Sequence, residues 1–258
     1  MNNYLKVILK KFINQFGYDI QKKKNFYTFI DKYDSYQEAF NASKNEIKYV
    51  TKEHQENHKL SNLEELEVLD RFHIFAVFCS ISFTQANDEL NFLEVGGGHN
   101  PIFLYILKST NKKYKFQILE EENFKIEVPK KYQDYLSYIY KLEDINFKKL
   151  HSVIFSGSIQ FMENYKIILN RLFANKINYI FITETFFTHG TEDIFVLQNN
   201  MENVRFPNIF FSFEKLHQLF YENDYKLIYN SQRKVGAYNH NILDKKDFFV
   251  KDLIYKIN

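Results

Sequence analysis

The 258-residue sequence has no tryptophan, one cysteine and three prolines. The single thiol, Cys79, excludes a disulfide within the chain and is consistent with a reducing compartment. Cys79 lies in the apolar stretch 72–83, where we expect a buried, inert thiol rather than a nucleophile. That stretch is shorter than the roughly 20 apolar residues of a membrane-spanning helix. The sequence therefore disfavours a disulfide-stabilised secreted protein and an integral membrane protein, and we expect a cytoplasmic one.

A strong excess of either charge is also missing. Lysine and arginine number 34, aspartate and glutamate number 32, and the formal net charge is +2. Nucleic-acid-binding domains usually carry a pronounced basic patch. The short basic runs at 22–24 and 130–131 are typical of solvated surface. We therefore expect no nucleic acid partner.

The histidines lack the spacing of metal ligands. The segment 54–58, His-Gln-Glu-Asn-His, resembles the helix of zinc proteases only superficially, because that motif requires glutamate where Gln55 stands. A catalytic zinc site needs three converging protein ligands. We predict that the protein has no metal site.

The first 90 residues are predicted to form a helical N-terminal cap. They contain one glycine and no proline, and apolar residues recur three and four positions apart in 36–49 and 63–78. In 5–16, apolar residues show the same spacing with lysines between them. We expect this helix to pack on the body of the protein, and a weak peripheral contact with a membrane surface is the alternative.

The pattern changes in 91–258, where short apolar runs rich in β-branched and aromatic residues alternate with helix-like segments. This alternation predicts an α/β domain with a mainly parallel sheet. The predicted strands are 92–95, 115–119, 152–155, 179–183, 193–198 and 225–229.

Three of the seven glycines, Gly96, Gly97 and Gly98, stand together between the predicted strand 92–95 and a helix-like run at 102–108. Glycine permits a positive φ and the close approach of backbone to a ligand. A strand, a tight glycine turn and a helix N-terminus form a nucleotide-binding corner. A simple strand-to-helix turn needs only one glycine, so the cluster favours a cofactor loop.

About two dozen residues later, the predicted strand 115–119 ends at Glu120. A carboxylate at this position of a Rossmann-like domain binds ribose hydroxyls, so Glu120 is the predicted ribose ligand. The dinucleotide fingerprint G-x-G-x-x-G, read from Gly96 and Gly98, needs a third glycine where Pro101 stands. This mismatch disfavours NAD and FAD.

Several segments together resemble a family of S-adenosylmethionine-dependent methyltransferases that are often encoded among bacterial surface-polysaccharide genes. The glycine turn, with Glu94 as the acid, is similar to the acidic-x-G-x-G pattern of class I methyltransferases. The other segments are Tyr-Asp-Ser-Tyr-Gln-Glu-Ala at 33–39, Ile-Leu-Glu at 118–120, Ser-Gly-Ser-Ile-Gln-Phe at 156–161 and Phe-Pro-Asn-Ile-Phe-Phe-Ser at 206–212.

The resemblance implies a Rossmann-like class I methyltransferase fold, S-adenosyl-L-methionine as cofactor and a small-molecule or glycan acceptor. Gln160 and Gln198 are the predicted acceptor contacts. The implied reaction is O-methylation of a sugar or another small polar group of a capsule or lipopolysaccharide, or of its activated precursor. The predicted cofactor residues are Glu94, Gly96, Gly97, Gly98, Glu120 and Ser156.

The chain departs from the family pattern in two places. After the fifth strand of the fold, the family has Arg-Thr-Pro, whereas this chain has Thr-Glu-Thr-Phe at 183–186. A later glycine of the first loop is replaced by His-Asn-Pro at 99–101. These departures predict altered substrate contacts and an altered loop near the methionine end of the cofactor.

A hydroxyl acceptor must lose its proton during methyl transfer, so one positioned base is enough. His189 follows the strand 179–183 at the edge where ligands of open α/β sheets bind, and imidazole titrates near neutrality. A solvated loop histidine is the alternative for this residue. Glu184, nearer the strand end, is the competing base or substrate ligand.

Two other functions are carried as alternatives. A catalytically silent Rossmann-like binding or scaffold protein would explain the irregular first loop. A NAD-dependent oxidoreductase is the third possibility, which Pro101 opposes.

Overall fold

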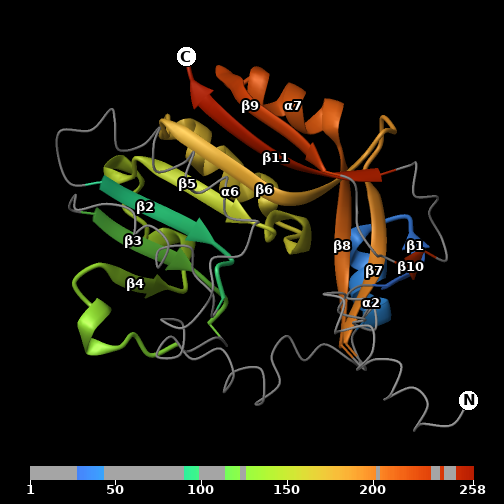
Figure 1. Ribbon diagram of the computed structural model, residues 1–258, viewed down its shortest axis with the longest axis horizontal. Helices are drawn as coiled ribbons and strands as arrows, with labels where there is room; N and C mark the ends of the chain where they lie inside the picture. The colour runs from blue at the N-terminus through green and yellow to red at the C-terminus, as the bar shows by residue number, and fades with distance from the viewer. Residues whose placement is uncertain are drawn as a thin grey trace, which may run out of the picture.

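The computed structural model describes residues 28–43, 90–98, 114–122, 126–201, 204–233, 239–240 and 248–258. They form a main sheet and a smaller accessory sheet, which join along the strand β6 (Figure 1). The strands β7 and β8 and the helix α2 lie together to one side of the main sheet.

The main sheet has the strand order β4-β3-β2-β5-β6-β11-β9. Neighbours from β4 to β6 are parallel, and β11 runs antiparallel to both β6 and β9. The strands are β2 (Leu90–Val95), β3 (Tyr114–Leu119), β4 (Leu136–Ile139), β5 (Ser152–Ser156), β6 (Tyr179–Thr188), β9 (Tyr225–Arg233) and β11 (Phe248–Ile257). This arrangement confirms the predicted Rossmann-like α/β fold with a mainly parallel sheet.

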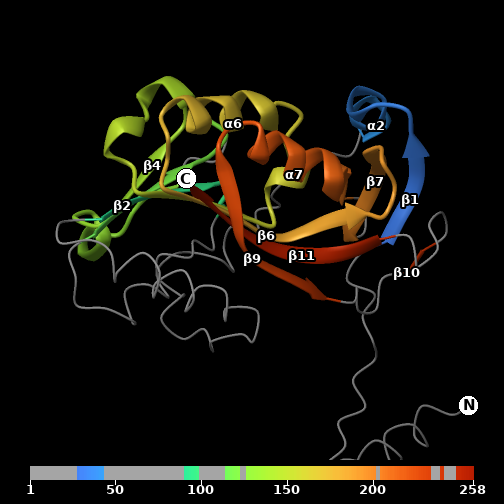
Figure 2. The ribbon, with the colours of Figure 1, turned by 90° about the horizontal axis from the view of Figure 1, so that it is seen from above.

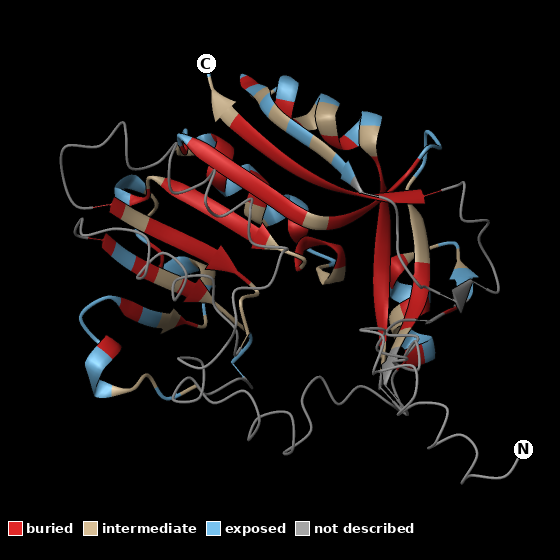
Figure 3. Cartoon of the chain, in the orientation of Figure 1, coloured by how far each residue is buried: buried red, intermediate tan, exposed pale blue. Residues whose placement is uncertain are grey.

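The central strands are apolar because both faces of a parallel sheet are covered. All of β5 is buried except Ser156, and all of β6 is buried except Glu184 (Figure 3). The helices α6 (Tyr165–Ala174) and α7 (Phe213–Tyr221) lie on one face of the sheet (Figure 2). Short 3-10 helices connect other strands: η3 (Lys130–Tyr132), η4 (Leu142–Asp144), η5 (Phe147–Lys149) and η6 (Ile159–Phe161).

The accessory sheet has the order β10-β1-β7-β8. Its strands are β1 (Thr28–Tyr33), β7 (Ile194–Met201), β8 (Val204–Ser212) and β10 (Asn239–His240). The antiparallel pair β7 and β8 is inserted between β6 and α7, and β1 pairs with β7. The helix α2 (Tyr36–Ser43) packs against β7 and β8. Six buried residues form a separate apolar core here: Phe29, Phe186, Val196, Phe210, Phe248 and Val250.

Each predicted strand coincides with an observed one, and α2 confirms the helical period at 36–43. The prediction of helix throughout the first 90 residues is wrong at 28–33, because this segment pairs with β7 as a strand. The division at residue 90 stays a prediction. The structure adds β4, β8, β10 and β11, which the sequence analysis missed. Other predictions lie outside the described residues, namely those for 5–16, 22–24, 44–49, 54–58, 63–78, Cys79, 99–101 and 102–108.

Among the helices that the structure describes, none is both long and apolar enough to cross a bilayer.

Candidate functional site

A cavity of about 820 Å³ opens beyond the carboxyl ends of the parallel strands. This is the edge at which ligands bind in open α/β sheets, and the volume is in the range of small-molecule sites. The ends of β2 and β3 and the loop after β5 contribute to it, together with α2, α6 and β8. The described lining residues are Tyr36, Phe40, Val95, Gly96, Gly98, Leu119, Glu120, Glu121, Tyr140, Gly157, Ser158, Phe161, Met162, Glu163, Asn164, Ile168 and Phe206.

The glycine turn after β2 forms one side of the cavity. Gly96 and Gly98 both have positive φ, +72° and +56°, which other residues rarely adopt. A Cβ on Gly96 would lie 2.8 Å from the Cβ of Ser158 and 2.9 Å from the Cε of Met162, whereas a Cβ on Gly98 would meet no atom of the described residues within 4 Å. Glycine is thus required at position 96 by both packing and backbone conformation, and at position 98 by backbone conformation alone.

Glu94 lies beneath this turn rather than on the cavity. Its side chain is 1% exposed, and a Cβ on Gly97 would approach the Glu94 carboxyl carbon to 2.7 Å. Neither Glu94 nor Gly97 is among the lining residues. Their geometry indicates support of the loop, and their predicted cofactor role stays a prediction.

Glu120, at the end of β3, lines the cavity and connects the end of β3 to the glycine turn after β2. Its carboxylate accepts hydrogen bonds from the N–H of Gly98 at 2.8 Å and from the N–H of Glu121 at 3.2 Å. The Tyr138 hydroxyl donates to the Gly98 carbonyl at 2.9 Å, so the turn is held on both sides. Burial raises the pKa of Glu120 above its usual value, and the two N–H donors partly offset this shift.

The loop after β5 supplies a further part of the lining. Gly157 has a φ of +64°, and the buried Ser158 hydroxyl donates to the carbonyl of Val95 at the end of β2. Ser156, the predicted cofactor ligand, is half-buried and is not among the lining residues. Ser158 of the same segment lines the cavity instead.

Glu184 occupies a β-bulge where β6 leaves β5. Thr183 and Glu184 together face Asp252 of β11, since the register shifts between the flanking pairs. Glu184 has a φ of +52°, a left-handed conformation that is costly for a residue with a Cβ. The Asp252 carboxylate accepts from the Glu184 N–H at 2.8 Å and from the Ser231 hydroxyl at 3.1 Å. The bulge turns Glu184 toward the loop after β5.

The Glu184 side chain lies beside Gly157 of the cavity lining. A Cβ on Gly157 would be 3.6 Å from the Glu184 Cβ and 3.8 Å from its Oε2. Gln160 is 3% exposed and its Nε2 donates to the Glu184 carbonyl at 3.3 Å, while its buried Oε1 has no hydrogen-bond partner in the described part of the chain. The structure therefore brings Glu184 and Gln160 together next to the cavity.

His189 and Gln198 are not brought to the cavity lining. His189 is exposed beyond the end of β6, with its ring centroid 4.4 Å from that of Phe249. At about 3.3 Å per strand residue, it is roughly 16 Å from Glu184 along the chain. Gln198 is buried in β7, and its Oε1 accepts from the Asn208 side chain at 2.5 Å.

An aromatic wall, which the sequence analysis missed, lines another part of the cavity: Tyr36, Phe40, Phe161 and Phe206. It combines residues of α2, η6 and β8. The Tyr36 hydroxyl donates to the Phe161 carbonyl at 2.5 Å, and the rings of Phe161 and Phe206 meet at an angle of 66° with centroids 6.1 Å apart. Aromatic residues are common throughout this sequence, so only the folded arrangement distinguishes these four.

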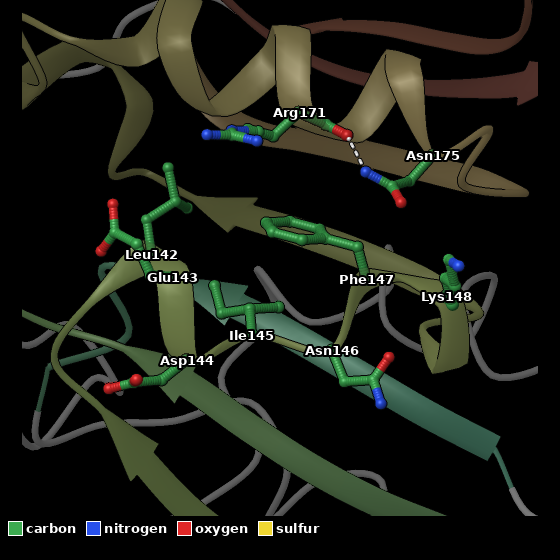
Figure 4. Close-up of a pocket in the computed structure, with 9 residues that line it drawn as sticks. All are labelled: Leu142, Glu143, Asp144, Ile145, Asn146, Phe147, Lys148, Arg171 and Asn175. Atoms are coloured by element: carbon green, nitrogen blue, oxygen red, sulfur yellow. Dashed lines mark hydrogen bonds between the residues drawn. The ribbon is translucent and has the colours of Figure 1, made fainter.

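A second hollow of about 590 Å³ lies between α6 and the segment 142–148 (Figure 4). Arg171 and Asn175 of α6 border it and are joined by a hydrogen bond from the Asn175 side chain to the Arg171 carbonyl. None of the predicted site residues lines this hollow. Among the described residues, no three His, Cys, Asp or Glu side chains converge as metal ligands.

The sequence matches no family model and no curated protein. The structure is similar to a SAM-dependent methyltransferase from Methanosarcina mazei, with a TM-score of 0.50 and 10% identity over 74% of this chain and 99% of that chain. It is also similar to the 1,6-didemethyltoxoflavin-N1-methyltransferase of Burkholderia thailandensis, with a TM-score of 0.50 and 12% identity over 93% of this chain and 99% of that chain. The chain therefore has the Rossmann-like fold of class I methyltransferases.

Proposed function

We propose that the protein is an S-adenosylmethionine-dependent methyltransferase. The observation that carries this proposal is the junction of the glycine turn and Glu120 at one cavity. The Burkholderia enzyme of similar fold was crystallised with S-adenosylhomocysteine, which supports the same class of cofactor here.

The residues of this junction fit the adenosylated cofactor. No atom of the described residues lies within 4 Å of the position of a Cβ on Gly98, which leaves room for a ligand to approach the backbone. The Glu120 carboxylate accepts hydrogen bonds, as a ribose diol requires. When bound, S-adenosylmethionine supplies an electrophilic methyl group and leaves as S-adenosylhomocysteine.

Glu184 is the better candidate for the general base. An acceptor oxygen that forms a bond to the methyl carbon must release its proton, and a base has to be within hydrogen-bond reach of that oxygen. Glu184 borders the cavity through Gly157, whereas His189 is exposed beyond the strand end. A carboxylate retained in a left-handed conformation is also typical of a functional site.

For the acceptor we propose a hydroxyl of a sugar or a similar small polar group, as in surface-polysaccharide synthesis. Support for this class comes from the resemblance of the segments 156–161 and 206–212. Both segments contribute residues to the cavity lining, namely Gly157, Ser158, Phe161 and Phe206. A protein that binds the cofactor but transfers no methyl group would favour the silent scaffold instead.

Isothermal titration calorimetry tests which cofactor the protein binds. S-adenosylmethionine and S-adenosylhomocysteine should bind and NAD should not. Glu120→Gln should weaken the S-adenosylhomocysteine affinity about tenfold to hundredfold, since a hydrogen bond to a charged group contributes about 1.5–3 kcal/mol. Glu121→Gln is the matched control because Glu121 lines the same cavity but lacks the bond to Gly98.

The pH dependence of this affinity provides a second reading. Ionised Glu120 is the form that accepts ribose hydrogen bonds, and its pKa is raised by burial. The affinity should therefore be highest above the raised pKa and fall as the pH is lowered through it, at a higher pH than for an ordinary glutamate. In Glu120→Gln this fall in affinity at low pH should disappear. Equal affinity of wild type and variant would place the ribose elsewhere.

A further inference from the structure

The aromatic wall has the fixed geometry of a ring-binding surface. Tyr36 and Phe206 are each 8% exposed, and the bond from Tyr36 to the Phe161 carbonyl ties α2 to η6. These residues come from outside the glycine turn and the end of β3, where the proposed cofactor contacts lie. Aromatic faces bind apolar faces of rings and exclude water from them.

The polar groups next to this wall accept hydrogen bonds. The Glu184 carboxylate lies beside Gly157, and the buried Oε1 of Gln160, in the same loop as Phe161, has no donor among the described residues. The carboxylate can accept a hydrogen bond from a ligand hydroxyl, whereas Gln160 is buried and is not among the lining residues. This border of the cavity is therefore suited to a ligand that bears a hydroxyl.

Carboxylates border the same cavity. Glu120, Glu121 and Glu163 line it, and Glu184 is adjacent through Gly157. In a partly buried site, like charges repel more strongly than in bulk water. A phosphate group on the acceptor would add negative charge to this environment.

We infer that the acceptor is a hydroxyl-bearing ring without phosphate, which packs on the aromatic wall and donates hydrogen bonds toward Glu184. This inference rests on the proposed methyltransferase function and deepens it. It selects a neutral glycoside over a phosphate-bearing form of the activated precursor that the sequence resemblance also allows. It assigns the wall and the loop 157–161 to acceptor specificity.

Ligand-observed NMR titrations on the full chain, saturated with S-adenosylhomocysteine, test the inference with matched pairs. The probes are the methyl glycosides of glucose, galactose, mannose and rhamnose, each against the corresponding 1-phosphate. At least one methyl glycoside should bind about tenfold more tightly than its 1-phosphate. Glu163→Gln should narrow that preference about two- to threefold, because it removes one exposed carboxylate from the lining.

Phe206→Leu tests the wall itself. It should weaken glycoside binding about two- to tenfold, the loss expected for an aromatic contact. Tyr221→Leu removes an aromatic ring that is 69% exposed on α7, outside the cavity, and should leave binding unchanged. The S-adenosylhomocysteine affinity of each variant reports whether its cavity is intact.

Tighter binding of any 1-phosphate than of its glycoside would overturn the inference. So would the absence of glycoside binding to a protein that does bind S-adenosylhomocysteine, or binding that Phe206→Leu does not weaken. Failure of wild-type protein to bind S-adenosylhomocysteine at all would instead overturn the proposed function.

Discussion

The main sheet and the accessory sheet differ in the longest separation along the chain between paired strands. In the main sheet, the most distant pairing joins Tyr179 of β6 to Lys256 of β11. In the accessory sheet, Thr28 of β1 lies opposite Asn199 of β7. The main sheet holds the predicted cofactor residues, while the accessory sheet and α2 supply part of the aromatic wall. The proposed cofactor contacts and the proposed acceptor contacts thus have separate structural origins.

β6 belongs to both regions and changes partner along its length. Its first half pairs with β5 up to Thr183, and its end pairs with β8 from Phe187 onward. The bulge at Glu184 lies between these two stretches, where a bulge bends a strand and redirects a side chain. The candidate base therefore lies at the junction between the two sheets.

The largest expected effect belongs to the glycine turn of the main sheet. Gly96→Val should abolish detectable S-adenosylhomocysteine binding in calorimetry and lower the free energy of unfolding. Overpacking against Ser158 and Met162 costs about 1–3 kcal/mol, and the left-handed backbone adds about 1–2 kcal/mol. Gly98→Ala is the matched control, because it introduces the cost of the left-handed backbone without the overpacking. This variant should still fold. If Gly96→Val bound S-adenosylhomocysteine with wild-type affinity, the glycine turn of the main sheet would not be the cofactor site.

At the junction, Glu184 and His189 can be compared in one assay of methyl transfer to a glycoside that binds. Glu184→Gln should lower kcat about 10²–10⁴-fold, the range for loss of a general base. His189→Ala should keep its turnover, because His189 lies outside the cavity lining. The reverse outcome would restore the histidine as the base.

Glu184→Gly separates catalysis from stability at the same position. Glycine adopts the positive φ freely, so the free energy of unfolding of this variant should equal that of the wild type or exceed it by about 1 kcal/mol. The variant should nevertheless lose turnover. A structural role alone would predict full turnover in this variant. Chemical denaturation and the turnover assay give the two readings.

In the accessory sheet, Phe29→Ala should lower the free energy of unfolding by about 3–5 kcal/mol. Phe29 is fully buried and contacts the rings of Phe186, Phe210 and Phe248. If the two sheets have separate roles, the folded fraction of this variant should retain the affinity for S-adenosylhomocysteine. Glycoside binding should weaken because the wall residue Phe206 lies in the same sheet. A loss of cofactor affinity alone would contradict the comparison.

The smallest effect on ligand binding is expected for Gln198→Met. It leaves the Asn208 side chain without its bond to Gln198, at a cost of about 1–3 kcal/mol. Since Gln198 is buried in β7 and does not line the cavity, glycoside affinity should stay unchanged. Weaker glycoside binding with unchanged stability would support the acceptor contact predicted for this glutamine.

The sequence by itself determined five strands of the main sheet (β2, β3, β5, β6 and β9), the strand β7 and the corner with Glu120. Strands buried on both faces appear as short apolar runs, and a glycine turn after such a run identifies its loop, because both signals are local. Only the tertiary structure decided β4 and β11, the pairing of the accessory sheet, the aromatic wall and the place of Glu184. The strand pair of β1 and β7 and the bulge opposite Asp252 depend on contacts between distant segments, which leave no local period in the chain. His189 and Glu184 are close in sequence, but an extended strand separates them, and the bulge turns Glu184 toward the loop that borders the cavity.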